Sequence, residues 1–253
     1  MTTVSDIYNM IEKLAPYSLQ ESYDNSGLNV GDMSAEVKSV LVALDCTAEV
    51  AREAVEKGFD LVLTHHPVIF RGLKTLSLEN PAVILAAGGK NAISMHTNFD
   101  SAQGGMNDIL CSMLGLVPGG ALHEEHGVCC GYICDCEPVK VEKLAEKAKA
   151  VLGCKAVRFC GARREVTRVG VCSGSGGSFL GDACERGCQA LITGDVKHDV
   201  FVDAHNMGIS VIDAGHFCTE NIFCDFMVKT LKESFPEIDA VTAESNYDIV
   251  EII

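Results

Sequence analysis

The sequence lacks any apolar run of the roughly 18–20 residues that a transmembrane helix needs, which excludes a chain that spans a membrane in this way. Its first residues (MTTVSDIYNMIEKLAPYS) lack the basic and apolar regions of a secretory signal, so we expect a cytoplasmic protein. Excess positive charge is also missing, since 20 Lys and Arg stand against 35 Asp and Glu. The resulting formal charge of −15 would repel polyanions, so neither nucleic acid nor a membrane is expected as a partner.

Tryptophan is absent, and the thirteen cysteines do not show the regular framework of a small secreted domain. They are scattered from Cys46 to Cys224 and odd in number, so we expect reduced thiols without an obligatory disulfide. Four of them lie within 129–136, where buried small side chains are favoured over a metal cluster. What the chain does have is 47% hydrophobic residues over 253 positions, enough for two modest globular domains.

Strand-like apolar segments alternate with helical segments through most of the chain. Strands are expected at 37–45, 60–64, 92–96, 128–134, 155–160, 167–172, 189–193, 209–213 and 247–252. Helices are expected between them, at 47–57, 81–87, 107–115, 138–152, 197–207 and 217–234. This alternation predicts an α/β protein with largely parallel pairing inside each domain. The polar, glycine-rich segment 117–127 is the expected passage between domains, with His123 and His126 solvated.

Metal-type ligands gather directly after three of these strands, where open α/β sheets place their sites. His65 and His66 follow the strand at 60–64. Adjacent residues in extended backbone point to opposite sides, so we expect each histidine to hold a different one of two neighbouring ions. Taken alone, either histidine would more often be a structural residue.

The other two groups pair an imidazole with a carboxylate. His96 and Asp100 follow the strand AISM, while His216 and Glu220 lie four residues apart at the start of a helix and therefore share one face. Together with the double histidine they form a mixed imidazole and carboxylate set, which suits zinc, manganese or iron rather than calcium. Two ions that share such a set acidify water, which is the chemistry of dinuclear hydrolases.

Two weaker motifs lie in the second half of the chain. Ser175, Gly176 and Gly177 belong to a glycine-rich segment that predicts either a phosphate-binding nest or only a tight turn from strand to helix. His198 follows the strand at 189–193 and is a candidate substrate contact. Asp195 beside it is as well explained as a helix cap.

Five segments together resemble one known family. They are YDNSGLNVGD (23–32), LTHHPVIF (63–70), HTNFD (96–100), SGSGGSFL (173–180) and ITGDVKHDVFVDAHNMGISVIDAGHFCTE (192–220). The family is that of the GTP cyclohydrolase I type 2 homologues, also called NGG-interacting-factor-three-like proteins, which carry a dinuclear metal centre. The sequence resembles its short form, without the extra mid-chain domain, and has Tyr23 where many members have tryptophan.

The resemblance implies a ligand set and an architecture. The implied metal ligands are His65, His66, Asp100, His216 and Glu220, with His96 beside them in the active cleft. The implied architecture is two interlinked α/β domains with the metal site in the cleft between them. The first would comprise 1–122 and 214–253, and the second 123–213. A toroidal homohexamer is also implied.

We therefore expect a hydrolase that uses two divalent metal ions on a small nucleotide-like or phosphorylated substrate, with His96 moving a proton or orienting the substrate. GTP ring opening is one instance of that class. The alternative is a non-catalytic protein that stores or delivers metal, or a scaffold, because the same ligands would serve it. Zinc, iron, manganese and nickel all accept imidazole and carboxylate ligands, so the ligand set leaves the native metal open.

Overall fold

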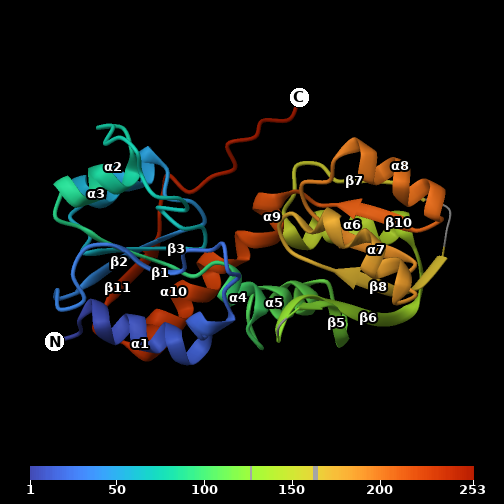
Figure 1. The fold of residues 1–253 in the computed structure, drawn as a ribbon, viewed down its shortest axis with the longest axis horizontal. Helices are drawn as coiled ribbons and strands as arrows, with labels where there is room; N and C mark the ends of the chain where they lie inside the picture. The colour runs from blue at the N-terminus through green and yellow to red at the C-terminus, as the bar shows by residue number, and fades with distance from the viewer. Residues whose placement is uncertain (126, 162–164) are drawn as a thin grey trace. The chain divides into compact units, whose positions relative to one another are not determined.

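The chain forms two compact units, each built around its own β-sheet (Figure 1). The structure is a computed structural model that describes residues 1–125, 127–161 and 165–253. Unit 1 comprises Met1–Ala102 and Phe223–Ile249, and unit 2 comprises Gln103–Ile222 and Val250–Ile253. These limits differ from the expected domain boundaries at 122/123 and 213/214. The α/β class is confirmed, since helices cover both sheets.

Unit 1 has a five-stranded sheet in the order β1-β4-β3-β2-β11. Its strands are β1 (Gly27–Val30), β2 (Ser39–Ala43), β3 (Leu61–Thr64), β4 (Asn91–Ser94) and β11 (Asp239–Thr242). All neighbours pair parallel except β1, which runs antiparallel to β4. Figure 1 shows one face of the sheet under α2 (Ala48–Glu56) and α3 (Pro81–Ala87), and the other over α1 (Val4–Leu14) and α10 (Ile222–Ser234). The short helices η1 (Tyr17–Leu19) and α4 (Thr97–Ser101) complete the unit.

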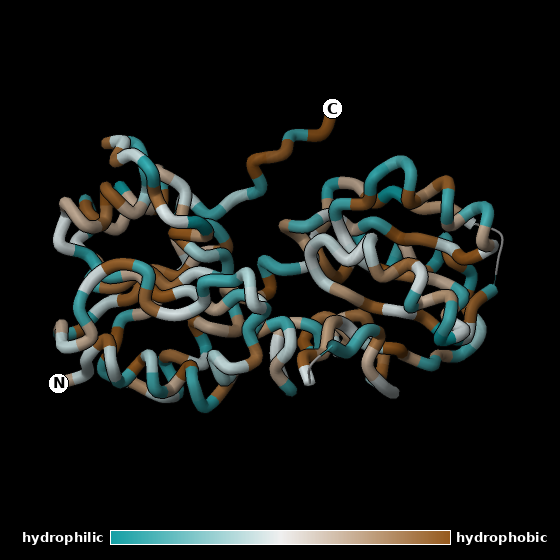
Figure 2. The backbone as a smooth tube through the Cα atoms, in the orientation of Figure 1, coloured by the Kyte–Doolittle hydropathy of each residue, from teal (hydrophilic) through white to brown (hydrophobic). Residues whose placement is uncertain are grey.

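Strand alternation in unit 1 supplies apolar side chains to both faces of the sheet. Leu41 and Val62 pack with Leu85 in a buried cluster beneath α2 and α3. Their neighbours Val40 and Leu63 are also fully buried, and their side chains point to the opposite face. Central strands buried on both sides read as continuous hydrophobic runs, which Figure 2 shows as brown stretches within the sheet.

Unit 2 has a six-stranded sheet in the order β5-β6-β8-β9-β10-β7. Its strands are β5 (Val117–Glu125), β6 (Val128–Lys140), β7 (Arg158–Phe159), β8 (Glu165–Val171), β9 (Ala190–Thr193) and β10 (Ser210–Asp213). Its helices are α5 (Met106–Met113), α6 (Val141–Leu152), η2 (Gly176–Phe179), α7 (Leu180–Glu185), α8 (His198–Met207) and α9 (His216–Glu220). Among the described residues of unit 2, only β8-β9 and β9-β10 pair parallel, so largely parallel pairing is correct for unit 1 and wrong for unit 2.

The segment expected as a polar passage is mostly a strand. Residues Val117–Glu125 pair antiparallel with β6 at the edge of the sheet, where Pro118 is tolerated because an edge strand bonds on one side only. His123 is only partly exposed, at 30% of its side chain, because its ring stacks on Phe179 at 5.0 Å and its Nδ1 lies 2.7 Å from Asp182. His126 lies outside the described residues. The hairpin explains why the segment belongs to unit 2.

The strand expected at 247–252 is also wrong, because these residues form no strand. The last strand is β11, which pairs parallel with β2 from Asp239 to Thr242. The periodicity in this region was too short to distinguish a strand from an apolar tail, and Ile249 and Val250 are exposed. Among the described residues, no helix is both long and apolar enough to cross a membrane.

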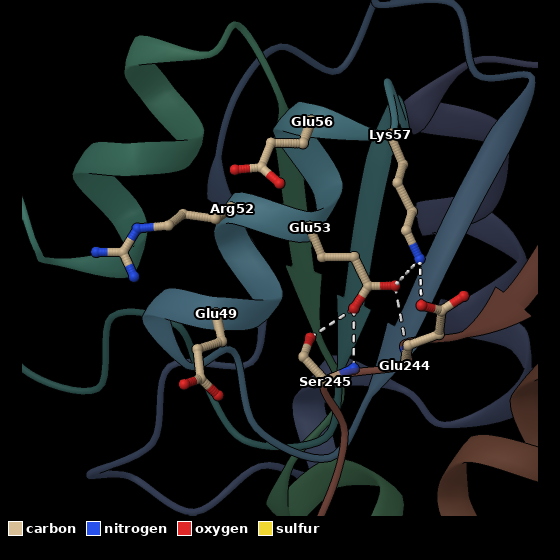
Figure 3. Close-up of a pocket in the computed structure, with 7 residues that line it drawn as sticks. All are labelled: Glu49, Arg52, Glu53, Glu56, Lys57, Glu244 and Ser245. Atoms are coloured by element: carbon tan, nitrogen blue, oxygen red, sulfur yellow. Dashed lines mark hydrogen bonds and ion pairs between the residues drawn. The ribbon is translucent and has the colours of Figure 1, made fainter.

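In a surface pocket of unit 1, hydrogen bonds and ion pairs connect the segment after β11 to α2 and the residue that follows it (Figure 3). The Glu53 carboxylate accepts hydrogen bonds from the Ser245 amide at 2.9 Å and from the Glu244 amide at 3.1 Å. Lys57 pairs with both Glu53 and Glu244. Burial raises the pKa of Glu53, but the hydrogen bonds from Ser245 and Glu244 outweigh it and lower the pKa to about 2.

A Glu53→Gln variant should therefore lose stability in a pH-dependent way. At pH 7 we expect its free energy of unfolding to fall by about 1–2 kcal/mol, because charged hydrogen bonds are lost. The contribution of a carboxylate with a lowered pKa is present above its ordinary value of 4.5 and is lost as pH falls toward 2. Urea unfolding of both proteins between pH 7 and pH 3 should show the difference shrinking. A constant difference, or an equal loss in Glu56→Gln on the same helix, would contradict this role.

Candidate metal-binding clusters

The histidines of unit 1 gather where three parallel strands end. The register aligns Ala43 of β2 with Thr64 of β3, and Thr64 with Ser94 of β4. Two residues beyond these positions, Asp45, His66 and His96 therefore stand at the same edge of the sheet. We call the side chains of His65, His66, His96 and Asp100 the unit 1 cluster.

Each imidazole in this cluster uses its Nδ1 for a hydrogen bond of 2.7 Å. The partner is the Met95 carbonyl oxygen for His65, an Asp45 carboxylate oxygen for His66 and an Asp24 carboxylate oxygen for His96. A carbonyl or a carboxylate only accepts, so each Nδ1 carries the proton and each neutral ring keeps its lone pair on Nε2. This tautomer is the one that a metal ligand requires, and carboxylate or carbonyl partners of this kind orient metal-binding histidines.

The rings of His65 and His66 do not point to opposite sides as expected. Their centroids lie 5.0 Å apart, and each lies within 5.4 Å of the His96 ring centroid. The expected opposite orientation is wrong because β3 ends at Thr64, whose Oγ1 donates to the His66 carbonyl at 2.7 Å, so strand alternation does not extend to the two histidines. That each histidine holds a different ion stays a prediction. One nitrogen of each of the three rings lies within 4.8 Å of the others.

Asp24 connects several groups beneath His96. Its side chain is fully buried and accepts hydrogen bonds from His96 Nδ1, from the Thr97 amide at 3.1 Å and from Thr97 Oγ1 at 2.6 Å. Burial raises the pKa of Asp24, but the hydrogen bonds and charge interaction with His96 and the bond from Thr97 outweigh it and hold the pKa well below its usual range. Asp24 is thus an anion at neutral pH, which fixes the orientation of His96.

Unit 2 carries the second group of predicted ligands at the ends of its own parallel strands. Thr193 of β9 is level with Asp213 of β10, and His216 follows at the start of α9. His216 Nδ1 lies 2.7 Å from an Asp195 carboxylate oxygen, while its Nε2 lies 2.8 Å from Glu220 Oε2. We call His216 and Glu220 the unit 2 pair. The shared helix face predicted from their spacing is present.

Two backbone features make room for this pair. Asp195 is the one non-glycine residue at positive φ in the described chain, at 50°, a conformation that costs energy and is common at functional sites. Gly174 has φ +59°, and a Cβ there would lie 2.1 Å from Glu220 Oε1 and 3.2 Å from His216 Nε2. Any side chain at position 174 would therefore occupy the space of the Glu220 carboxylate.

The glycine-rich segment around Gly174 uses several of its amides inside the protein. The Ser173 amide donates to Asn107, the Gly174 amide to Thr219 Oγ1 at 3.0 Å, and the Gly176 amide to Thr193 Oγ1 at 2.8 Å. These bonds favour the tight-turn interpretation for this part of the segment. Contacts of Ser175, Gly176, Gly177 and the exposed His198 with a substrate stay predictions.

The chemistry of both groups fits divalent metal ions. Two ligand atoms that each lie about 2.1 Å from one ion are about 3.0–3.5 Å apart. His65 Nε2 and Asp100 Oδ1 are 3.5 Å apart, within this range, whereas His216 Nε2 and Glu220 Oε2 are 2.8 Å apart, slightly closer than two ligands of one ion. Imidazole nitrogens with fixed Nδ1 protons beside carboxylate oxygens are ligands for zinc, iron, manganese or nickel.

Three of the histidines are held by carboxylates that the sequence motifs did not identify as partners: Asp24, Asp45 and Asp195. Asp195 was noted only as a helix cap or cleft residue, and the other two were not singled out. The positions of two of these aspartates could have identified them. Asp45 and Asp195 each stand two residues after a strand and 21 residues before the histidine that they hold.

Comparison with known proteins gives one family across almost the whole chain. Residues 2–248 match the model of the Duf34/NIF3 (NGG1p interacting factor 3) family. A Clostridium perfringens protein named GTP cyclohydrolase 1 type 2 homolog is 38% identical over 228 residues, which cover 86% of each chain. A Helicobacter pylori protein named GTP cyclohydrolase 1 type 2 is 33% identical over 261 aligned positions, with full coverage of both chains.

The fold is also shared with solved structures. The crystal structure of a Staphylococcus aureus hypothetical protein superposes with a TM-score of 0.90 at 27% identity and covers 99% of both chains. A Bacillus cereus protein related to NIF3 gives a TM-score of 0.88 at 22% identity, covering 100% of this chain and 99% of that one. At that identity the second likeness concerns the fold alone.

An Asp45→Ala variant should weaken metal binding without unfolding the chain. Loss of the carboxylate frees the His66 ring to rotate, and such losses typically cost roughly 10–100-fold in metal affinity. Zinc titration of the metal-free protein against a competing chelator measures the change. Asp182→Ala is the matched control, because Asp182 holds the Nδ1 of His123 at the same 2.7 Å outside both groups. Equal zinc affinities in both variants would remove Asp45 from the site.

A Gly174→Ala variant should reduce metal content in addition to stability. Its Cβ would displace the Glu220 carboxylate, and the left-handed backbone adds strain of about 1–2 kcal/mol. Gly187→Ala is the control for backbone strain alone, because Gly187 has φ +74° and a Cβ added there would have no atom within 4 Å. Urea unfolding and elemental analysis should show similar backbone strain in both and a loss of metal only in Gly174→Ala. Full metal content there would contradict the close approach to Glu220.

Proposed function

Because this chain belongs to the Duf34/NIF3 (NGG1p interacting factor 3) family, we propose that it is a hydrolase that uses two divalent metal ions on a small nucleotide-like or phosphorylated substrate. The ligands in this proposal are His65, His66 and Asp100 of unit 1 with His216 and Glu220 of unit 2. The names of the relatives, GTP cyclohydrolase 1 type 2 and its homologues, support nucleotide chemistry.

The observation that carries the proposal is the convergence of imidazoles with bonded Nδ1 atoms: His123 makes the same bond alone, whereas His65, His66 and His96 each offer a nitrogen within 4.8 Å of the others. His65, His66, His96 and His216 each have Nδ1 bonded to an acceptor at 2.7 Å, in both units. A histidine that only fills space does not need a fixed tautomer, whereas a metal ligand does. Three of the acceptors are carboxylates, which are common partners of metal-binding histidines and fix the orientation of the ring.

The roles of the side chains follow from these bonds. Two bound divalent ions would lower the pKa of water toward neutrality and so supply a nucleophile. His96 keeps a basic Nε2 while Asp24 holds its Nδ1–H, so His96 can accept a proton from the attacking water and deliver it to the leaving group. The Asp24 carboxylate stabilises the imidazolium form that His96 adopts between these two transfers.

A Glu220→Gln variant tests the proposal. Replacing the carboxylate by an amide keeps the shape and removes the charge, so we expect the metal content to fall from about two ions per chain to one or none, with metal-dependent activity falling at least 100-fold. The measurements are elemental analysis of untagged protein and hydrolysis of GTP and a panel of phosphate esters. Glu185→Gln, an exposed change in α7, is the control. Two ions and normal turnover in Glu220→Gln would refute the assignment.

The same experiment separates catalysis from metal handling. About two ions per wild-type chain without turnover of any substrate would favour a protein that stores or delivers metal. No ions under metal-replete conditions would remove both functions. The homohexamer implied by the resemblance stays a prediction, and light scattering would check whether the particle mass is six times the 27.0 kDa of one chain.

A further inference from the structure

Two exposed aromatic side chains of unit 1 lie close together, and one of them contacts His96. Tyr23 is 64% exposed and Phe70 is 40% exposed, although the chain has only five tyrosines, ten phenylalanines and no tryptophan. Their ring centroids lie 6.3 Å apart, and that of Phe70 lies 6.0 Å from the His96 ring centroid. Both belong to segments that build the site, because Tyr23 directly precedes Asp24 and Phe70 follows the double histidine in the same loop. We call Tyr23 and Phe70 the aromatic pair.

Packing does not explain why these rings are left exposed. Aromatic rings contribute most when buried, and the other rings near the cluster, Phe99 and Phe223, are completely buried. The rings of the aromatic pair meet at an interplanar angle of 57°, and those of Phe70 and His96 meet at 77°. The three rings therefore do not stack face to face on one another. An exposed ring face next to a reactive group is the feature that binds planar heterocycles by stacking.

The loop that carries Phe70 also differs in charge from the rest of the chain. Residues 67–78 (PVIFRGLKTLSL) contain Arg71 and Lys74 and no acidic residue, in a chain whose net charge is −15. Both basic side chains are exposed, and in the described part of the chain neither takes part in an ion pair. Phe70 is thus followed by two exposed basic residues, which favour an anionic group on the same ligand that stacks.

We infer that the aromatic pair is the binding subsite for the ring of the substrate, and that Arg71 and Lys74 contact its anionic group. The substrate class is then a heterocycle that bears phosphate, such as a nucleotide, rather than an aliphatic phosphate ester. This inference rests on the proposed function, because it uses the same site. Stacking recognises the face of a ring and not its hydrogen-bonding edge, so the subsite selects planar rings without distinguishing strongly between purines.

The absence of tryptophan allows a direct binding measurement. A Tyr23→Trp variant carries a single indole in the aromatic pair, and stacking of a purine on that indole should quench its fluorescence in a saturable way. The titrations use metal-loaded protein with GTP, ATP, guanosine and glycerol 3-phosphate. We expect both nucleotides to quench with affinities within about tenfold of each other, guanosine to bind more weakly and glycerol 3-phosphate not to quench. Tyr247→Trp, at another exposed tyrosine of unit 1, is the control and should respond to none of them.

Loss of either ring should weaken nucleotide binding. Calorimetric titration of Tyr23→Leu and Phe70→Leu with GTP should give dissociation constants about tenfold or more above wild type, while Tyr23→Phe and Phe70→Tyr retain binding. Arg71→Gln and Lys74→Gln should weaken GTP binding but leave guanosine binding unchanged. Metal content, measured in parallel, should stay at the wild-type value in all six variants.

The outcomes distinguish the subsite from the proposed function. Nucleotide binding that depends on the rings, in a protein without turnover, supports the subsite and refutes the hydrolase. Metal-dependent turnover of an aliphatic ester, with no nucleotide binding, refutes the subsite and leaves the hydrolase standing. Wild-type GTP affinity in both leucine variants, or no quenching of Tyr23→Trp by either nucleotide, overturns the inference.

Discussion

In each unit, parallel strands end at one edge of a sheet, and the register of their pairing decides which side chains meet there. Ala43, Thr64 and Ser94 are level in unit 1, and Thr193 and Asp213 are level in unit 2. A shift of one residue would turn every strand side chain to the other face and would separate each histidine from its partner. The continuous apolar runs of these buried strands make such a shift costly, so the core that stabilises the sheet also fixes the chemistry at its edge.

The two units bring a histidine and its carboxylate partner together with similar local geometry. An aspartate two residues after one strand holds the Nδ1 of a histidine that follows the next strand, as Asp45 holds His66 and Asp195 holds His216. In unit 2 the arrangement depends on two unusual backbone positions. Asp195 has a positive φ, and Gly174 has no side chain and so leaves space for Glu220. Unit 1 adds a buried anion, Asp24, bonded to His96, which lies next to the exposed ring of Phe70. In both units the candidate metal-binding histidines are therefore held in fixed orientations by acceptors on Nδ1.

Much of this could be predicted because the signals are local. A run such as LVLT followed by His65 and His66 marks both the buried strand and its polar end within a few residues. The partners of the histidines were not predictable in the same way, since an aspartate after a strand is equally typical of a turn, and Asp24 is 72 residues from His96. The strand Val117–Glu125 was missed because its glycines and Pro118 favour a loop, and pairing with β6 overrides that preference. Finding these contacts requires the strand order and register, which one sequence does not contain.

The discontinuity of unit 1 has a consequence for synthesis on the ribosome. Chains emerge from the amino terminus and fold as units at about 5–20 residues per second. All six strands of unit 2 have been made once Asp213 is translated, but β2 of unit 1 has no neighbour on one side until β11 arrives at Asp239–Thr242. The outer edge of β2 therefore stays unpaired while unit 2 is synthesised. The sheet of unit 1 can therefore be completed only after the whole of the unit 2 sheet has been synthesised.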